Sequence, residues 1–307
     1  MQRVIIKKHL LNAEKHADGC AINVEFAHKL FGLLMLMITS QNAFITLIHY
    51  SIKLCIIAAM EPIRCTLIVF DINSKAKTNY ELKLARFEPN SNSIYLEGKI
   101  YAIGGFITSK NVYVVNFKAL TLHRKADMIK GKCAHTLCNA RRYIYAIGDM
   151  NESKSDCQKY SVANDKWSTL PHLQEGRYYC AAFSFKNAEV YAAYGHNDSF
   201  LYVSTIEKIN IANPNKWHYI NVANPITPRN GMNAIQIDDT KVLIYGGKNK
   251  KGKSNGSYIL SFSDRGIVCN QSACLMSSNQ FIEGPTPVFD GVNVYAVSFE
   301  KTFIFSL

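Results

Sequence analysis

Short apolar runs that end in small residues recur along the chain. They are IYAIGG (100–105), IYAIGD (144–149), VYAAYG (190–195), VLIYGG (242–247) and VYAVSF (294–299), and their last residues are 44, 46, 52 and 52 residues apart. Each run is rich in β-branched or aromatic residues, which is typical of a strand buried on both faces. A repeat of this length predicts the four-stranded blades of a β-propeller.

Further strands are expected on both sides of each run. A short apolar segment precedes it, as in SIYL (93–96), CAAFSF (180–185) and MNAIQI (232–237). A third strand follows it in VYVVNF (112–117), CQKYSV (157–162), STIEKINI (204–211), SYILSF (257–262) and TFIFSL (302–307). In two units an Asn-rich turn then leads to Trp167 or Trp217. We interpret both tryptophans as structural residues that pack between blades.

The small residues at the run ends are expected to lie where strands crowd together or where the backbone needs a positive φ. They are Gly104, Gly105, Gly148, Gly195, Gly246 and Gly247. The last run ends in Ser298 and Phe299 instead, so its blade is a degenerate copy.

A strand ending in Gly-Gly, a later Tyr and a Trp after a turn together resemble the kelch repeat. The resemblance covers about 240 residues and is strongest in the two central units. A further similarity is an upstream Arg: Arg86, Arg177 and Arg229 precede Gly105, Gly195 and Gly247 by 19, 18 and 18 residues. The resemblance implies an all-β, kelch-type β-propeller that binds a protein or peptide through loops on one face.

Residues 61–307 are predicted to form this propeller, with six four-stranded blades and a degenerate first blade, or five blades as the alternative. TLIVFDIN (66–73) and YELKL (80–84) look like the outer strands of a first unit without an obvious inner half. Either the apolar stretch 44–60 supplies irregular inner strands, or N-terminal strands close the ring against C-terminal ones.

Residues 1–60 are expected to form a short N-terminal extension, partly hydrophobic, and either helical or a degenerate blade. The apolar segments 30–38 and 44–60 contain polar interruptions, whereas a membrane-spanning helix needs about 20 apolar residues, so a membrane anchor is the weaker reading. The first thirty residues are polar and mixed in charge, which does not fit a secretory leader.

Metal binding has little support in the sequence. A zinc knuckle built from His9, His16, Cys20 and His28 would lack the usual short ligand spacings. The nine cysteines include no CxxC pair and suggest reduced thiols in a cytoplasmic protein. No metal or cofactor is expected.

The net charge of +12 allows acidic partners, although most basic residues are scattered. The exception is Lys248, Lys250, Lys251 and Lys253, in a segment (248–257) predicted to be a mobile loop beside the ring opening. These lysines could attract an acidic segment or merely keep the loop solvated. Arg177 and Arg229 could bind a partner carboxylate or pair within or between blades. His196 is the face-loop histidine considered for partner contact.

The sequence thus predicts a non-catalytic protein-interaction scaffold or adaptor. Some kelch proteins recruit targets to ubiquitin ligases, but the residues before this repeat do not resemble the assembly domain that such proteins carry. The alternative is a kelch-fold enzyme, either copper oxidase-like or sugar-acid isomerase-like, although no HxxH, GxSxG or phosphate-loop motif stands out. Nucleic-acid binding would rest on charge alone, without a basic and aromatic stacking array.

Overall fold

The computed structural model describes residues 55–61, 64–70, 77–81, 91–97, 99–106, 109–116, 119–151, 153–253, 256–272, 287–289, 291–297 and 302–306. All regular secondary structure within these residues is β-strand. The chain divides into two compact units, Met1–Lys53 and Leu54–Leu307, and every described residue belongs to the second. Among the described residues, no helical segment has the length and hydrophobicity that a membrane crossing requires.

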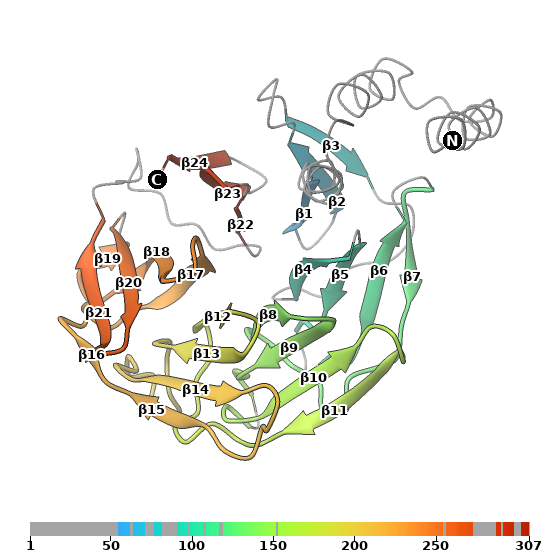
Figure 1. The fold of residues 1–307 in the computed structure, drawn as a ribbon. Coiled ribbons are helices and arrows are strands. Elements are labelled where there is room, and N and C mark those ends of the chain that lie inside the picture. The colour runs from blue at the N-terminus through green and yellow to red at the C-terminus, as the bar shows by residue number, and fades with distance from the viewer. Residues whose placement is uncertain are drawn as a thin grey trace, which may run out of the picture. The chain divides into compact units, whose positions relative to one another are not determined.

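Four central sheets, antiparallel except for one strand pair in the fourth, follow one another along the chain (Figure 1). The first contains β4 (Asn92–Leu96), β5 (Lys99–Ile103), β6 (Val112–Asn116) and β7 (Thr121–Arg124). The second contains β8 (Thr136–Ala140), β9 (Tyr143–Ile147), β10 (Cys157–Ser161) and β11 (Lys166–Leu170). The third contains β12 (Ala181–Phe185), β13 (Glu189–Ala193), β14 (Ile206–Asn210) and β15 (His218–Ile220).

The fourth central sheet is larger. Its main strands are β17 (Asn230–Gln236), β18 (Lys241–Asn249), β20 (Ser257–Ser263) and β21 (Gly266–Gln271). It also includes β19 (Gly252–Lys253), which pairs with β18, and β16 (Val222–Ala223), which runs parallel to β21.

Two three-stranded sheets lie at the ends of this series in the sequence. One contains β1 (Cys55–Glu61), β2 (Arg64–Phe70) and β3 (Lys77–Glu81), and the other β22 (Val288–Phe289), β23 (Asn293–Val297) and β24 (Thr302–Ser306). β2 and β3 correspond to the predicted outer strands of the first unit. β1 starts inside the stretch 44–60, which was considered as a source of irregular inner strands. Residues 1–54, which include the candidate zinc ligands, lie outside the described residues, as does Arg86.

The five repeated runs form β5, β9, β13, β18 and β23, so the predicted strands at these places are confirmed. Each is the second strand of its sheet and is paired on both sides. The all-β fold with four-stranded antiparallel sheets is consistent with blades of a β-propeller. The number of blades and the closure of a ring stay predictions.

Apolar side chains fill the space between successive sheets. The first strands of neighbouring sheets touch, β4 with β8, β8 with β12, and β12 with β17. Trp167 is buried with residues of β4–β5 and β8–β9, and Trp217 with residues of β8–β9 and β12–β13. Each indole Nε1–H donates to the linker that enters its own sheet, at Ala126 (3.0 Å) and Pro171 (2.9 Å). Both tryptophans therefore tie a linker to an intersheet core.

One expectation needs correction. The segment beginning at Lys248 is not a long loop, because β18 continues to Asn249 and turns tightly into β19, which pairs Lys248 with Lys253. In the third run, Tyr194 stands at the position that Gly148 holds in the second run, and both residues have a left-handed φ, +60° and +72°. Gly195 stands one position later in the repeat. A buried tyrosine thus replaces a glycine at a left-handed position of the repeat.

Candidate interaction surface

Two sets of loops lie against each other on one side of the sheets. One set follows the second strand of each sheet, and the other links each sheet to the next. Backbone hydrogen bonds join them: Met128 N donates to Lys110 O (3.0 Å), Leu173 N to Ser155 O (2.9 Å), and Arg177 N to Lys154 O (2.9 Å). The linkers are thereby fixed along the preceding loops, so side chains from both sets can contribute to one surface.

Arg177 lies inside this framework and not on its surface. All five N–H groups of its guanidinium have acceptors: the carbonyl oxygens of Glu175, Tyr194 and Thr205, the Thr205 hydroxyl and the Glu207 carboxylate. The side chains of Arg177 and Glu207 are fully buried. Glu207 also accepts from the backbone N–H groups of Gln174 (2.7 Å) and Glu175 (3.2 Å). The pair therefore holds the linker onto β14.

Arg229 and Lys132 occupy equivalent places in the next and the preceding sheet. Buried Arg229 donates to Gly246 O (3.4 Å) and to the Tyr258 hydroxyl (3.2 Å), with its guanidinium 5.1 Å from the centre of that ring. Lys132 Nζ donates to Gly148 O (3.1 Å) and forms an ion pair with Asp156 (2.8 Å). The geometry of Arg177 and Arg229 thus fits pairing within a sheet and not binding of a partner carboxylate. We therefore leave Arg177 and Arg229 out of the proposed contact surface.

Lys132 was missed in the sequence because only arginines were compared between units. It stands four residues before β8, just as Arg177 stands four residues before β12. A search for any basic residue at this spacing would have found it.

An aromatic patch with two exposed side chains lies beside this framework. The patch consists of the exposed Phe200 and Leu201, the half-buried His196 and Tyr202, and the buried Tyr178. The His196 ring centre lies 5.5 Å from that of Tyr178 and 4.4 Å from that of Tyr202, and Phe200 meets Tyr178 edge to face at 6.4 Å. Phe200 and Leu201 are 74% and 57% exposed. Clustered large apolar side chains in contact with water are typical of a protein-binding site.

The loop between β13 and β14 holds these side chains in place. His196 and Tyr178 exchange backbone hydrogen bonds, both of 3.0 Å. The Asn197 side-chain oxygen accepts from the N–H groups of Ser199 (3.0 Å) and Leu201 (3.1 Å), which closes a tight turn. Phe200 has φ of +56°, which is strained for a residue with a Cβ atom. The loop is therefore built to present Phe200 and Leu201 to solvent.

Charged side chains flank the aromatic patch. Lys154 Nζ pairs with Asp198 at 2.8 Å and lies 5.8 Å from the centre of the Tyr178 ring. Burial, together with the nearby Lys248 ammonium, lowers the pKa of His196. His196 Nδ1 lies 3.3 Å from Asn230 Nδ2.

Of the lysines predicted as a group, Lys248 lies beside the patch. Lys248, Lys250 and Lys251 are exposed on the β18–β19 turn, and Lys248 is the strand partner of Asn230. The side chain of Lys253 lies outside the described part. We call Lys248, Lys250 and Lys251 the lysine hairpin.

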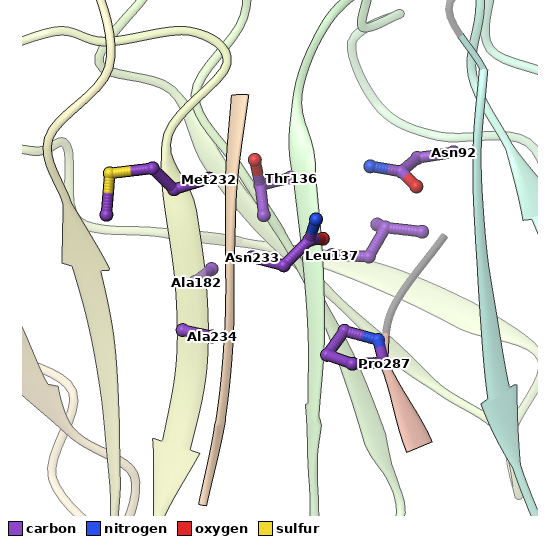
Figure 2. A pocket seen from close by; sticks show the side chains of 8 residues that line it. All are labelled: Asn92, Thr136, Leu137, Ala182, Met232, Asn233, Ala234 and Pro287. Carbon is purple, nitrogen blue, oxygen red and sulfur yellow. The ribbon is translucent and has the colours of Figure 1, made fainter. Parts of the chain in front are cut away.

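A second candidate site is a narrow hollow among the first strands of the sheets, shown in Figure 2. It has about 260 Å³ of empty space, part of it open to solvent, and is lined by Asn92, Thr136, Leu137, Ala182, Met232, Asn233, Ala234 and Pro287. Ligand pockets usually enclose about 300–1,000 Å³, whereas the space in this hollow that water-sized molecules can occupy is only about 20 Å³. The lining contains amides and a hydroxyl but no acid, base or thiol. The aromatic patch is therefore the stronger site.

No group of three or more His, Cys, Asp or Glu side chains suited to a metal ion occurs among the described residues. Five cysteines whose side chains the structure describes are buried free thiols: Cys133, Cys138, Cys157, Cys180 and Cys269. Burial raises the pKa of the Cys157 thiol to about 12 and of the Cys269 thiol to about 11, which keeps them protonated and unreactive at neutral pH.

Comparison with known proteins gives limited similarity. No protein family model matches the chain. A stretch of 94 residues is 30% identical to the Kelch repeat and BTB domain-containing protein 2 of Ectromelia virus (strain Moscow). The match covers 28% of this chain and 16% of the viral protein. This similarity and the four-stranded antiparallel sheets are together consistent with kelch-type repeats.

Proposed function

We propose that this chain is a non-catalytic protein-interaction module, a scaffold or adaptor that binds a partner protein or peptide through the aromatic patch. The observation that carries the proposal is the exposure of Phe200 and Leu201 on a fixed turn over the packed rings of Tyr178, His196 and Tyr202. Aromatic residues in such clusters dominate the energetics of many protein interfaces. Similarity to a viral protein with kelch repeats supports the same class of function.

The test compares partners captured by the wild-type chain and by Phe200→Ala combined with Leu201→Ala. Removing two anchor side chains is expected to cost about 2 kcal/mol or more, which weakens binding about 30-fold. The measurement is the quantified recovery of partner proteins from cells that express each tagged chain.

Tyr219→Ala is the matched control, because Tyr219 is also a large exposed side chain (49%) but lies on the outer strand β15. The control is expected to keep every partner. Partners that survive the patch variant and disappear with Tyr219→Ala would contradict the proposed surface.

The proposal includes a cytoplasmic location, supported by the buried free thiols, because such thiols persist in a reducing compartment. Cell fractionation with the untagged chain tests it. Recovery in the secretory fraction would contradict it.

A further inference from the structure

We infer that the partner segment is an acidic peptide carrying a large apolar side chain, bound across the aromatic patch and the lysine hairpin together. The inference rests on the proposed function and adds the chemistry of the partner. One continuous surface would bind two features of the same segment, an apolar side chain and a negative charge.

The patch and the hairpin are physically continuous. Lys248 on β18 pairs with Asn230 on β17, and the Asn230 amide lies 3.3 Å from His196, a member of the aromatic patch. The effect of the Lys248 charge on the pKa of His196 agrees with this proximity. A peptide of a few residues seated on Phe200 can therefore extend toward the lysines.

The charges on this surface are unbalanced. No ion pair joins Lys248, Lys250 or Lys251 to a carboxylate of the described residues. The exposed carboxylate of Asp198, on the patch loop, is already paired with Lys154. An incoming carboxylate would meet uncompensated ammonium groups, which speed the encounter and favour acidic segments over neutral ones.

The apolar half of the surface favours a peptide over a plain polyanion. A phosphate backbone has no apolar group that could be buried against Phe200 and Leu201. An aliphatic or aromatic side chain of a peptide would be buried against them. Single-stranded nucleic acid, which can also combine charge with stacking, is the competing ligand that the experiment must separate.

The experiment selects a phage-displayed library of random 12-residue peptides on four proteins. They are the wild-type chain, Phe200→Ala with Leu201→Ala, Lys250→Glu with Lys251→Glu, and the control Lys166→Glu with Lys216→Glu. The control changes the net charge by the same amount at two exposed lysines away from the hairpin. Unchanged thermal melting of each variant verifies folding.

The wild-type chain is expected to enrich peptides with Asp or Glu within a few residues of Phe, Leu or Trp. Affinity for the best peptide should fall at least 10-fold with either surface variant and less than 2-fold with the control. It should also weaken as salt is raised.

The two proposals fail in different ways. Enriched peptides that need Phe200 and Leu201 but show no acidic preference, or ignore Lys250→Glu with Lys251→Glu, would overturn this inference and leave the proposed function standing. If the selection yields no peptide whose binding depends on the aromatic patch, both proposals are overturned. A mixed-sequence oligonucleotide that binds more tightly than the best peptide, and is lost in the same variants, would replace the peptide with nucleic acid.

Discussion

At the scale of single residues, two glycines with the same backbone angle have different surroundings. Gly148 and Gly246 both have a left-handed φ, +72° and +73°. A Cβ atom at Gly148 would lie 2.1 Å from the carbonyl oxygen of Arg177 in the linker to the next sheet, whereas one at Gly246 would meet nothing within 4 Å. Gly148 is thus required by close approach of backbone as well as by its own conformation.

Gly148→Ala is expected to lower the free energy of unfolding well beyond the loss in Gly246→Ala. The left-handed conformation alone costs an L-residue about 1–2 kcal/mol, and Gly148→Ala must also displace the Arg177 backbone. Urea denaturation measures the free energy of unfolding of both variants. Gly246→Ala is the control for the cost of a left-handed φ in a residue with a Cβ atom. Equal losses in the two variants would show that the intersheet contact has no energetic weight.

His135 makes stability depend on pH. It is buried, and both ring nitrogens lack a hydrogen-bond partner among the described residues. Burial, and then the Lys132 charge, lowers its pKa to about 3. The unfolded chain binds the proton near pH 6.5, so the stability is fully present above that pH and is lost as the pH falls toward 3.

The expected loss from His135 is about 2 kcal/mol between pH 6.5 and 5. Urea denaturation at pH 7 and pH 5 tests this on the wild-type chain and on His135→Leu, which should lose less stability over that interval. His196, whose lowered pKa acts with the same sign, is present in both proteins and cancels in the comparison. An identical pH dependence in the two proteins would exclude a titrating role for His135.

At the scale of elements, a buried ion pair fastens a linker to the third sheet. The Glu207 carboxylate on β14 accepts hydrogen bonds from the Arg177 guanidinium and from the backbone N–H groups of Gln174 and Glu175. A pair of this kind is costly to break, because the remaining charge stays buried without a partner.

Arg177→Leu is expected to destabilise the chain by about 3–5 kcal/mol, since Glu207 would remain as an unpaired buried carboxylate. Arg142→Leu is the control. Arg142 pairs with Glu97 at 2.9 Å but is 77% exposed, and such surface pairs contribute about 0–1 kcal/mol. Equal melting temperatures for the two variants would contradict the role given to the buried pair.

Elements with a strong apolar signal could be predicted from the sequence, and the others could not. The second strands were found because both of their faces are buried, which leaves continuous runs such as IYAI in β9. β8 (TLCNA) and β21 (GIVCNQ) mix polar and apolar residues and were not predicted. β19 is only two residues long. The small size of a strand and its mixed pattern remove the periodic signal.

At the scale of the whole molecule, the described sheets are joined in series by backbone hydrogen bonds. Gly105 N donates to Lys132 O (2.8 Å), and Gly195 N to Arg229 O (3.0 Å), each from one sheet to the residue that enters the next. Tyr179 N donates to Ala134 O (2.9 Å), which joins two successive linkers. Because these bonds involve main-chain atoms, side-chain identity does not encode them directly.

The candidate surface is a consequence of the same assembly and was only partly predictable. His196 and the lysine hairpin were identified from loop position and charge. Phe200 and Leu201 were missed, because a loop has no periodicity that separates exposed apolar residues from buried ones. Arg177 and Arg229 were found from their spacing, but their burial depends on contacts within the sheets that only the three-dimensional structure gives.

Site-specific photo-crosslinking in cells tests most directly whether the aromatic patch is the contact surface. A photoreactive phenylalanine analogue replaces Phe200 in one protein and Tyr219 in another, and crosslinked products are separated by mass. The account predicts a discrete partner adduct from position 200 and none from position 219. Adducts from position 219 alone, or no adduct at position 200 while a partner is still co-purified, would contradict it.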